Sequence, residues 1–181
     1  MAGLQTEPHT AGEHGQETGP SGFLRKTTPM NIRIRDAQPH ELPALLALYE
    51  HLHAADEPLP DAATVAQVWG DICRDPKLHC LVAEVDDALV ASCILAVIPN
   101  LTRSARPYGL IENVVTRAEY RHQGIGTALL RHALTVAWEN GCYKVMLLTG
   151  RKDEGVFRFY KKAGFRRDVK TGFIAYPDDA D

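Results

Sequence analysis

The sequence of 181 residues has few cysteines, no long apolar run and no surplus of basic residues. Its cysteines show no paired spacing that would hold zinc, so we interpret them as reduced thiols. No apolar stretch reaches the roughly 20 residues of a membrane-spanning helix, and no signal peptide opens the chain. The net charge of −3 does not favour a general nucleic-acid binder. These absences predict a soluble, cytoplasmic protein without a membrane or nucleic-acid partner.

The first 29 residues differ in composition from the rest of the chain, because Gly, Thr, Glu, Pro, Gln and His dominate there. Such a segment cannot bury enough apolar surface to offset its ordering entropy. We therefore predict a disordered tail over residues 1–29, one domain over residues 30–177 and a short C-terminal tail over residues 178–181. Met30 directly precedes the first predicted strand, so we hypothesise that it is the true or an alternative start.

Apolar spacing predicts an alternation of helices and strands. Strands are expected near residues 31–35, 78–85, 89–98, 110–116 and 143–149, and helices near 39–53, from Asp61 onward, and over 125–137. The two strands around residues 86–88 form an antiparallel pair joined by a turn. The later order of strand, loop, helix and strand implies a parallel crossover.

The loop between the central predicted strand and the following helix contains Gly124 and Gly126. Glycine permits sharp turns and lets a ligand approach the main chain. The amides from about Gln123 to Thr127 are the unpaired first N–H groups of a helix, which favours an anion such as phosphate. The loop lacks the Gly-Lys-Ser/Thr ending of a Walker loop, and Leu129 replaces the third glycine of the dinucleotide fingerprint. Gly-x-Gly alone is also common in tight turns.

Two motifs narrow this interpretation. Arg121, Gly124 and Gly126 fit the pattern Arg/Gln-x-x-Gly-x-Gly/Ala, and residues 159–165 read Phe-Tyr-Lys-Lys-Ala-Gly-Phe. With these motifs the chain resembles the GNAT superfamily of N-acetyltransferases over residues 31–176. The resemblance implies an α/β (α+β) GNAT fold with a mixed central sheet of six to seven strands, about four flanking helices, and splayed parallel strands at the cofactor site.

The resemblance also implies acetyl transfer from acetyl-CoA to an amine, by direct attack in a ternary complex and without a metal. The positions expected to bind acetyl-CoA are Val114, Val115, Thr116, Arg121, His122, Gln123, Gly124, Ile125, Gly126, Thr127, Asp153, Phe157 and Tyr160. The main chain near Val114 or Val115 is expected to donate a hydrogen bond to the acetyl oxygen. Asp153 stands where relatives often carry an asparagine that binds the pantetheine.

Tyr160 and Glu112 are the predicted catalytic residues. A phenol stays protonated at neutral pH and can give its proton to the departing thiolate, although Tyr160 also suits a packed aromatic position. Glu112 is the predicted base, because a carboxylate in a mostly apolar central strand is costly; the alternative is an ion pair with Arg121 or Arg103. Strand alternation places Ile111, Asn113 and Val115 on one face and Leu110, Glu112 and Val114 on the other.

The sequence indicates the acceptor of the acetyl group less clearly than it indicates the donor. Residues 111–115 and 141–145 look like the glucosamine-6-phosphate N-acetyltransferase branch, but that branch then has an acidic segment where residues 147–150 here read Leu-Leu-Thr-Gly. We therefore predict a small-molecule primary amine. A protein lysine or N-terminal acetyltransferase and a noncatalytic acetyl-CoA-binding regulator remain alternatives, and a homodimer is compatible with the family. The candidate acceptor contacts are His53, Arg103, Tyr108 and Glu112. The cluster of His51, His53 and Asp56 lacks a fourth ligand, so no metal is expected.

Overall fold

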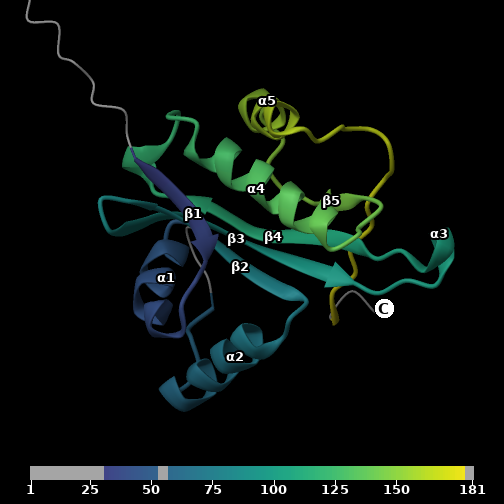
Figure 1. The fold of residues 1–181 in the computed structure, drawn as a ribbon. Helices are drawn as coiled ribbons and strands as arrows, with labels where there is room; N and C mark the ends of the chain where they lie inside the picture. Colours follow the sequence, from purple (N-terminus) through teal and green to yellow (C-terminus); the bar gives the residue numbers. More distant parts are fainter. Residues whose placement is uncertain (1–30, 53–56, 178–181) are drawn as a thin grey trace, which may run out of the picture.

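The computed structural model describes residues 31–52 and 57–177. Its centre is one sheet with the strand order β1-β2-β3-β4-β5 (Figure 1). The strands are β1 Ile32–Asp36, β2 Leu78–Val85, β3 Ala88–Ile98, β4 Tyr108–Thr116 and β5 Val145–Leu147. Neighbours from β1 to β4 are antiparallel, whereas β4 and β5 are parallel. The predicted mixed sheet and its parallel crossover are therefore confirmed. The predicted tails and Met30 lie outside the described residues.

Helices cover both faces of this sheet (Figure 1). Their bounds are α1 Leu42–Tyr49, α2 Ala62–Arg74, α3 Thr102–Ala105, α4 Ile125–Glu139 and α5 Glu154–Ala163, with 3-10 turns at Pro39–Glu41 and Ala118–Tyr120. One core lies beneath α4, where Leu129 and Leu130 pack on Leu95. A second core lies beneath α1 and α2, where Leu45 and Trp69 pack on β2 and β3. Among the described residues, no helix is long and apolar enough to cross a membrane.

We expected six to seven strands and about four helices, and these numbers are wrong. The described part of the chain forms five strands and five helices. Residues 166–176 form no strand after α5. They begin with Arg-Arg-Asp, and the later Phe173 and Ile174 are 90% and 64% exposed, so no apolar surface of the described chain draws this segment into the sheet. The additional helix is α3, a single turn in which Arg103 and Ser104 have left-handed φ values of 58° and 60°.

A network around Arg35 ties β1 to the turn that precedes α1. The guanidinium donates hydrogen bonds of 2.8 Å and 2.6 Å to the two carboxylate oxygens of Glu41, and it also bonds Glu84 on β2. The side chains of Arg35 and Glu41 are only 19% and 13% exposed. Hydrogen bonding to Arg35 lowers the pKa of Glu41 from 4.5 to about 2.

We expect Glu41→Gln to lower the free energy of unfolding by about 1 kcal/mol at pH 7, the scale of a solvent-screened but bidentate pair. Because the pKa of Glu41 is lowered on folding, its contribution is complete above pH 4.5 and is lost as the pH falls toward 2. Urea unfolding at pH 7 and pH 3 should therefore show a smaller difference at pH 3. Asp71→Asn, in an exposed pair with Arg74, is the matched control and should have almost no effect. An equal loss at both pH values would contradict this assignment.

Candidate active site

A bulge interrupts β4 in the middle of the sheet. From Glu112 to Val115, β4 advances by three residues while β3 advances by two, so Asn113 and Val114 lie opposite a single residue. Asn113 takes a left-handed φ of 54°, a conformation that asparagine tolerates better than most residues. The inserted residue leaves backbone groups outside the ladder at this point.

This bulge makes the predicted alternation wrong beyond Asn113. Val114 packs in the core beneath α4 together with Ile111, with which it was not expected to share a face. Val115 instead lies opposite Ser92 of β3. One additional residue in a strand moves every residue that follows to the opposite face of the sheet. The sequence pattern does not show where such a residue has been added.

β4 and β5 pair over three residues and then separate. Their register ends where Ile111 lies opposite Leu147, whereas β4 continues to Thr116. Within the described chain, residues 112–116 of β4 therefore have no strand beside them on this edge. A free strand edge presents N–H and C=O groups to an extended ligand, which binds it as an added strand would.

The loop after β4 ends in the first turn of α4, where backbone amides are free. Gly124 caps the helix with a left-handed φ of 84°, and the first helical bond runs from the Ala128 N–H to the Gly124 carbonyl at 2.9 Å. The N–H groups of residues 125–127 consequently have no helical acceptor. They lie at the positive end of the helix dipole, which suits a phosphate group.

Side chains of the loop brace it from within. Arg121 donates from Nε to the Thr116 carbonyl at 3.0 Å, and Gln123 donates from its side-chain amide to the Glu119 carbonyl at 2.8 Å. His122, exposed between them, has a left-handed φ of 61°. Because Arg121 uses only Nε in this contact, its two terminal nitrogens remain for a ligand.

The two glycines of the loop are needed for different reasons. A Cβ at Gly124 would meet nothing within 4 Å, so only its positive φ favours glycine. A Cβ at Gly126 would lie 3.1 Å from Thr116 Oγ1 and 3.2 Å from the ring of Phe159. Gly126 thus lets α4 approach both β4 and α5, and it brings the two sequence motifs into contact.

Tyr160 lies on α5, and its ring packs between Phe159 and Phe165 at centroid distances of 4.9 Å and 6.3 Å. Burial raises the pKa of its hydroxyl above 10, and the charge of Glu112 adds to this effect. The nearby Thr149 hydroxyl and Arg151 charge act in the opposite direction on the same pKa. The hydroxyl therefore stays protonated at neutral pH.

Glu112 does not occupy the buried position that the apolar strand suggested. Its side chain is exposed, because β4 bulges and loses β5 at this point. None of the ion pairs formed by the described residues includes Glu112, so the alternative pairing with Arg121 or Arg103 is absent there. The carboxylate is thus accessible to a substrate at the free edge of β4.

Comparison with known proteins identifies the family to which this chain belongs. The family model of the acetyltransferase (GNAT) family matches residues 43–165, more than half of the chain. The chain belongs to the GNAT family. GNAT enzymes transfer acetyl groups from acetyl-CoA, and this chain is accordingly an acetyltransferase.

Relatives span most of this GNAT chain. It is 32% identical over 142 residues to the glucosamine 6-phosphate N-acetyltransferase of Trypanosoma brucei brucei, covering 77% of this chain and 92% of the relative. It is 31% identical over 172 residues to a candidate enzyme of the same name from Oryza sativa subsp. japonica, covering 91% and 93%. A solved structure of a candidate acetyltransferase from Agrobacterium tumefaciens superposes with a TM-score of 0.74 at 43% identity, covering 80% of this chain and 99% of the other.

The remaining predicted cofactor residues of this GNAT enzyme lie on α5 or cap its start. The carboxylate of Asp153 caps the helix by accepting the Val156 N–H at 2.9 Å, and its second oxygen lies 3.4 Å from Arg151 Nε. The guanidinium of Arg167 lies over the ring of Phe157, 4.0 Å from its centroid. Capping accounts for an acidic residue at position 153, and the proposed contact with pantetheine remains a prediction.

Two of the predicted acceptor residues, Arg103 and Tyr108, lie away from the GNAT loop. Tyr108 begins β4 four residues before Glu112, roughly 13 Å along the strand, and Arg103 precedes it. Arg103, Ser104, Arg106 and Tyr143 line a hollow of about 590 Å³ there. His53 lies outside the described residues.

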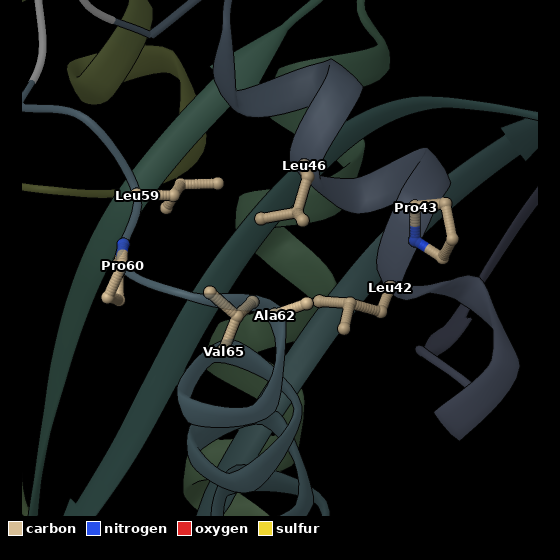
Figure 2. A pocket seen from close by; sticks show the side chains of 7 residues that line it. All are labelled: Leu42, Pro43, Leu46, Leu59, Pro60, Ala62 and Val65. Carbon is tan, nitrogen blue, oxygen red and sulfur yellow. The ribbon is translucent and has the colours of Figure 1, made fainter.

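Sequence reasoning missed an apolar groove between α1 and α2, in which Leu46 and Leu59 approach each other from opposite walls (Figure 2). Its volume is about 310 Å³, and its other lining residues are also apolar. The pair Leu59-Pro60 before α2 is the signal that marks this groove in the sequence.

Proposed function

We propose that this enzyme transfers the acetyl group of acetyl-CoA to the primary amine of a small molecule, by direct attack in a ternary complex. The observation that carries the proposal is the edge of β4 that β5 leaves open, which begins at the exposed Glu112 and leads to the free amides at the start of α4. The names of the Trypanosoma and rice relatives support an amino-sugar phosphate as a member of the acceptor class.

The residues present suit acetyl-CoA. We propose that the free amides of residues 125–127 and the terminal nitrogens of Arg121 hold the pyrophosphate. The open edge of β4 over Val114, Val115 and Thr116 then binds the pantetheine by main-chain hydrogen bonds. An amide freed by the bulge at Asn113 and Val114 donates to the acetyl oxygen as negative charge develops there.

Glu112 and Tyr160 divide the proton transfers in this proposal. An alkyl amine with a pKa near 10.4 is mostly protonated at neutral pH, so Glu112 takes a proton from it, directly or through water. The free amine attacks the thioester carbonyl, its C–N bond forms and the C–S bond breaks. Tyr160 gives its proton to the departing sulfur, and the product amide releases its remaining ammonium proton to solvent.

Glu112→Gln should lower kcat/KM about 100-fold at pH 6.5 and much less at pH 9.5, where more of the amine is already deprotonated. The measurement is a pH–rate profile that follows CoA release. Glu119→Gln, in the 3-10 turn after β4, is the matched control and should keep the wild-type profile. An unchanged profile in Glu112→Gln would remove the carboxylate from the base role.

The acceptor class is tested by a panel of amines at fixed acetyl-CoA. We expect glucosamine 6-phosphate or another small primary amine to be acetylated with a higher kcat/KM than a lysine-containing peptide or a peptide with a free N-terminus. Preference for a peptide would replace the small-molecule acceptor by a protein substrate. Tight binding of acetyl-CoA in calorimetry without turnover of any amine would indicate a regulatory protein instead.

A further inference from the structure

His122 is the second residue of the loop 121–124, which leads from the 3-10 turn after β4 into α4. Its side chain is exposed, and its backbone has a left-handed φ of 61°. A residue with a Cβ adopts this conformation at a cost that glycine avoids. The chain therefore keeps a side chain at this position that the turn itself does not require.

The side chains on either side of His122 are bound within the loop, whereas its own is not. Arg121 donates to the Thr116 carbonyl at 3.0 Å, and Gln123 donates to the Glu119 carbonyl at 2.8 Å. Within the part of the chain that the structure describes, the His122 imidazole forms no hydrogen bond or ion pair. It is therefore available to a ligand at this loop.

An anion at the start of α4 lies within reach of this imidazole. Consecutive Cα atoms are about 3.8 Å apart, so the Cα atom of His122 is at most about 7.6 Å from that of Gly124. Gly124 caps α4 directly before the free N–H groups of residues 125–127. The residue before His122 is Arg121, whose two terminal nitrogens remain for a ligand. The imidazole thus lies between two groups of donors that suit a phosphate.

We propose that the imidazole of His122 is a cationic contact to a phosphate group of CoA, and that this contact makes the affinity for the cofactor depend on pH. The inference rests on the proposed function, in which the loop holds the pyrophosphate through main-chain amides and Arg121. A protonated imidazole can donate from both ring nitrogens to phosphate oxygens. The neutral ring brings no charge, so the contact is strongest when the imidazole is protonated.

Histidine is the residue type whose charge changes between pH 6 and 8, whereas arginine, lysine and carboxylate side chains carry their charges throughout that range. Because Phe159 meets Gly126, α5 packs against the start of α4. The charged and titratable groups nearest to His122 on the loop, the 3-10 turn, α4 and α5 are Arg117, Glu119, Tyr120, Arg121, Arg131, His132 and Arg158. His132 lies about 10 Å beyond the start of α4. Since a bound phosphate favours the protonated imidazole, the contribution of His122 to affinity is complete at low pH and is lost as the pH rises through this range.

Calorimetry of the full-length protein with CoA at pH 6.0 and pH 8.5 measures this dependence, because CoA binds without turnover. His122→Asn removes the titrating ring, and asparagine tolerates a left-handed φ. His40→Asn is the matched control, because His40 is an exposed histidine in the 3-10 turn before α1. Proton NMR of the His122 ring, with its signal assigned from His122→Asn, follows its titration with and without CoA.

Between pH 6.0 and pH 8.5 the wild type should lose about fivefold more affinity for CoA than His122→Asn loses, the upper end of what an exposed ion pair contributes. High salt should remove most of this difference, because it screens exposed charges. The ring of His122 should titrate at a higher pH when CoA is bound, and His40→Asn should match the wild type. The same pH dependence in the wild type and His122→Asn overturns the inference, as does a titration of His122 that CoA leaves unchanged.

A parallel series with 3′-dephospho-CoA identifies the phosphate that His122 contacts. If the difference between the wild type and His122→Asn persists, the contact is with the pyrophosphate. If the difference disappears, the contact is with the 3′-phosphate. In both cases the comparison of the two proteins cancels the titration of the cofactor itself.

The two proposals fail in different ways. If the wild type binds CoA but acetylates no amine, the proposed function is wrong, and the pH series still decides the role of His122. If the wild type is active and His122→Asn keeps its pH dependence of CoA affinity, the role of His122 is wrong while the proposed function stands. A wild type that binds no CoA contradicts both. Should His122→Asn fail to fold by circular dichroism, His122→Gly, which suits a positive φ best, replaces it.

Discussion

Tyr160→Phe is expected to lower kcat for acetyl transfer about 100-fold while the affinity for acetyl-CoA stays within about twofold. The change removes only the hydroxyl, so the ring keeps its packing between Phe159 and Phe165. Burial raises the pKa of this hydroxyl above 10, which keeps the proton in place until the thiolate departs. Without that donor, the sulfur must leave unprotonated or wait for water. Steady-state release of CoA gives kcat, and calorimetry gives the affinity.

Tyr143→Phe is the control for this experiment, because Tyr143 lines the hollow at the opposite end of the sheet. It should behave as the wild type in both measurements. If Tyr160→Phe keeps the wild-type kcat, the phenol is only a packed aromatic and the proton must come from water. A parallel fall in acetyl-CoA affinity would assign Tyr160 to cofactor binding.

Gly126→Val is expected to weaken acetyl-CoA binding more than 10-fold and to destabilise the fold by about 1–3 kcal/mol, the usual range for overpacking. A Cβ at this position already lies 3.1 Å from Thr116 Oγ1 and 3.2 Å from the Phe159 ring. Both neighbours belong to elements that form the proposed cofactor site. To relieve the contact, α4 must move away from β4 or α5, and the free amides of residues 125–127 move with it. Calorimetry with acetyl-CoA and thermal unfolding measure the two effects.

Gly124→Ala separates this steric effect from a conformational one. Nothing lies within 4 Å of a Cβ at Gly124, so the expected cost is about 1 kcal/mol for placing alanine at a φ of 84°. Gly150→Ala, with neither strain nor a close contact, should be neutral. Acetyl-CoA binding of Gly126→Val at wild-type strength would show that the α4 loop is not the pyrophosphate site.

Several elements could be predicted because local chemistry decides them. β2 and β3 are long apolar runs separated by Asp86 and Asp87, which take the left-handed φ values of 49° and 61° that a tight hairpin turn needs. The second helix was expected from Asp61 onward, and the carboxylate of Asp61 caps α2 by accepting the N–H groups of Ala63 and Thr64. The glycine loop could be predicted for the same reason, because a sharp turn from a strand into a helix limits which residues can occupy the loop itself.

Other features depend on contacts between distant segments. The exposure of Glu112 follows from the departure of β5, and the changed face of Val115 follows from the pairing of β4 with β3. The shorter sheet likewise reflects the missing apolar partner for Phe173 and Ile174 in the described chain.

The sequence by itself determined the acetyl donor. Gly124, Gly126 and the Phe159-Tyr160 segment identify a GNAT enzyme, because an anion-binding turn must be built from neighbouring residues. Only the tertiary structure decided the arrangement of the chemistry. A bulge in β4 and the short pairing of β5 leave the edge of β4 open beside Glu112, and backbone pairing of this kind depends on the strand opposite rather than on the residues that bulge.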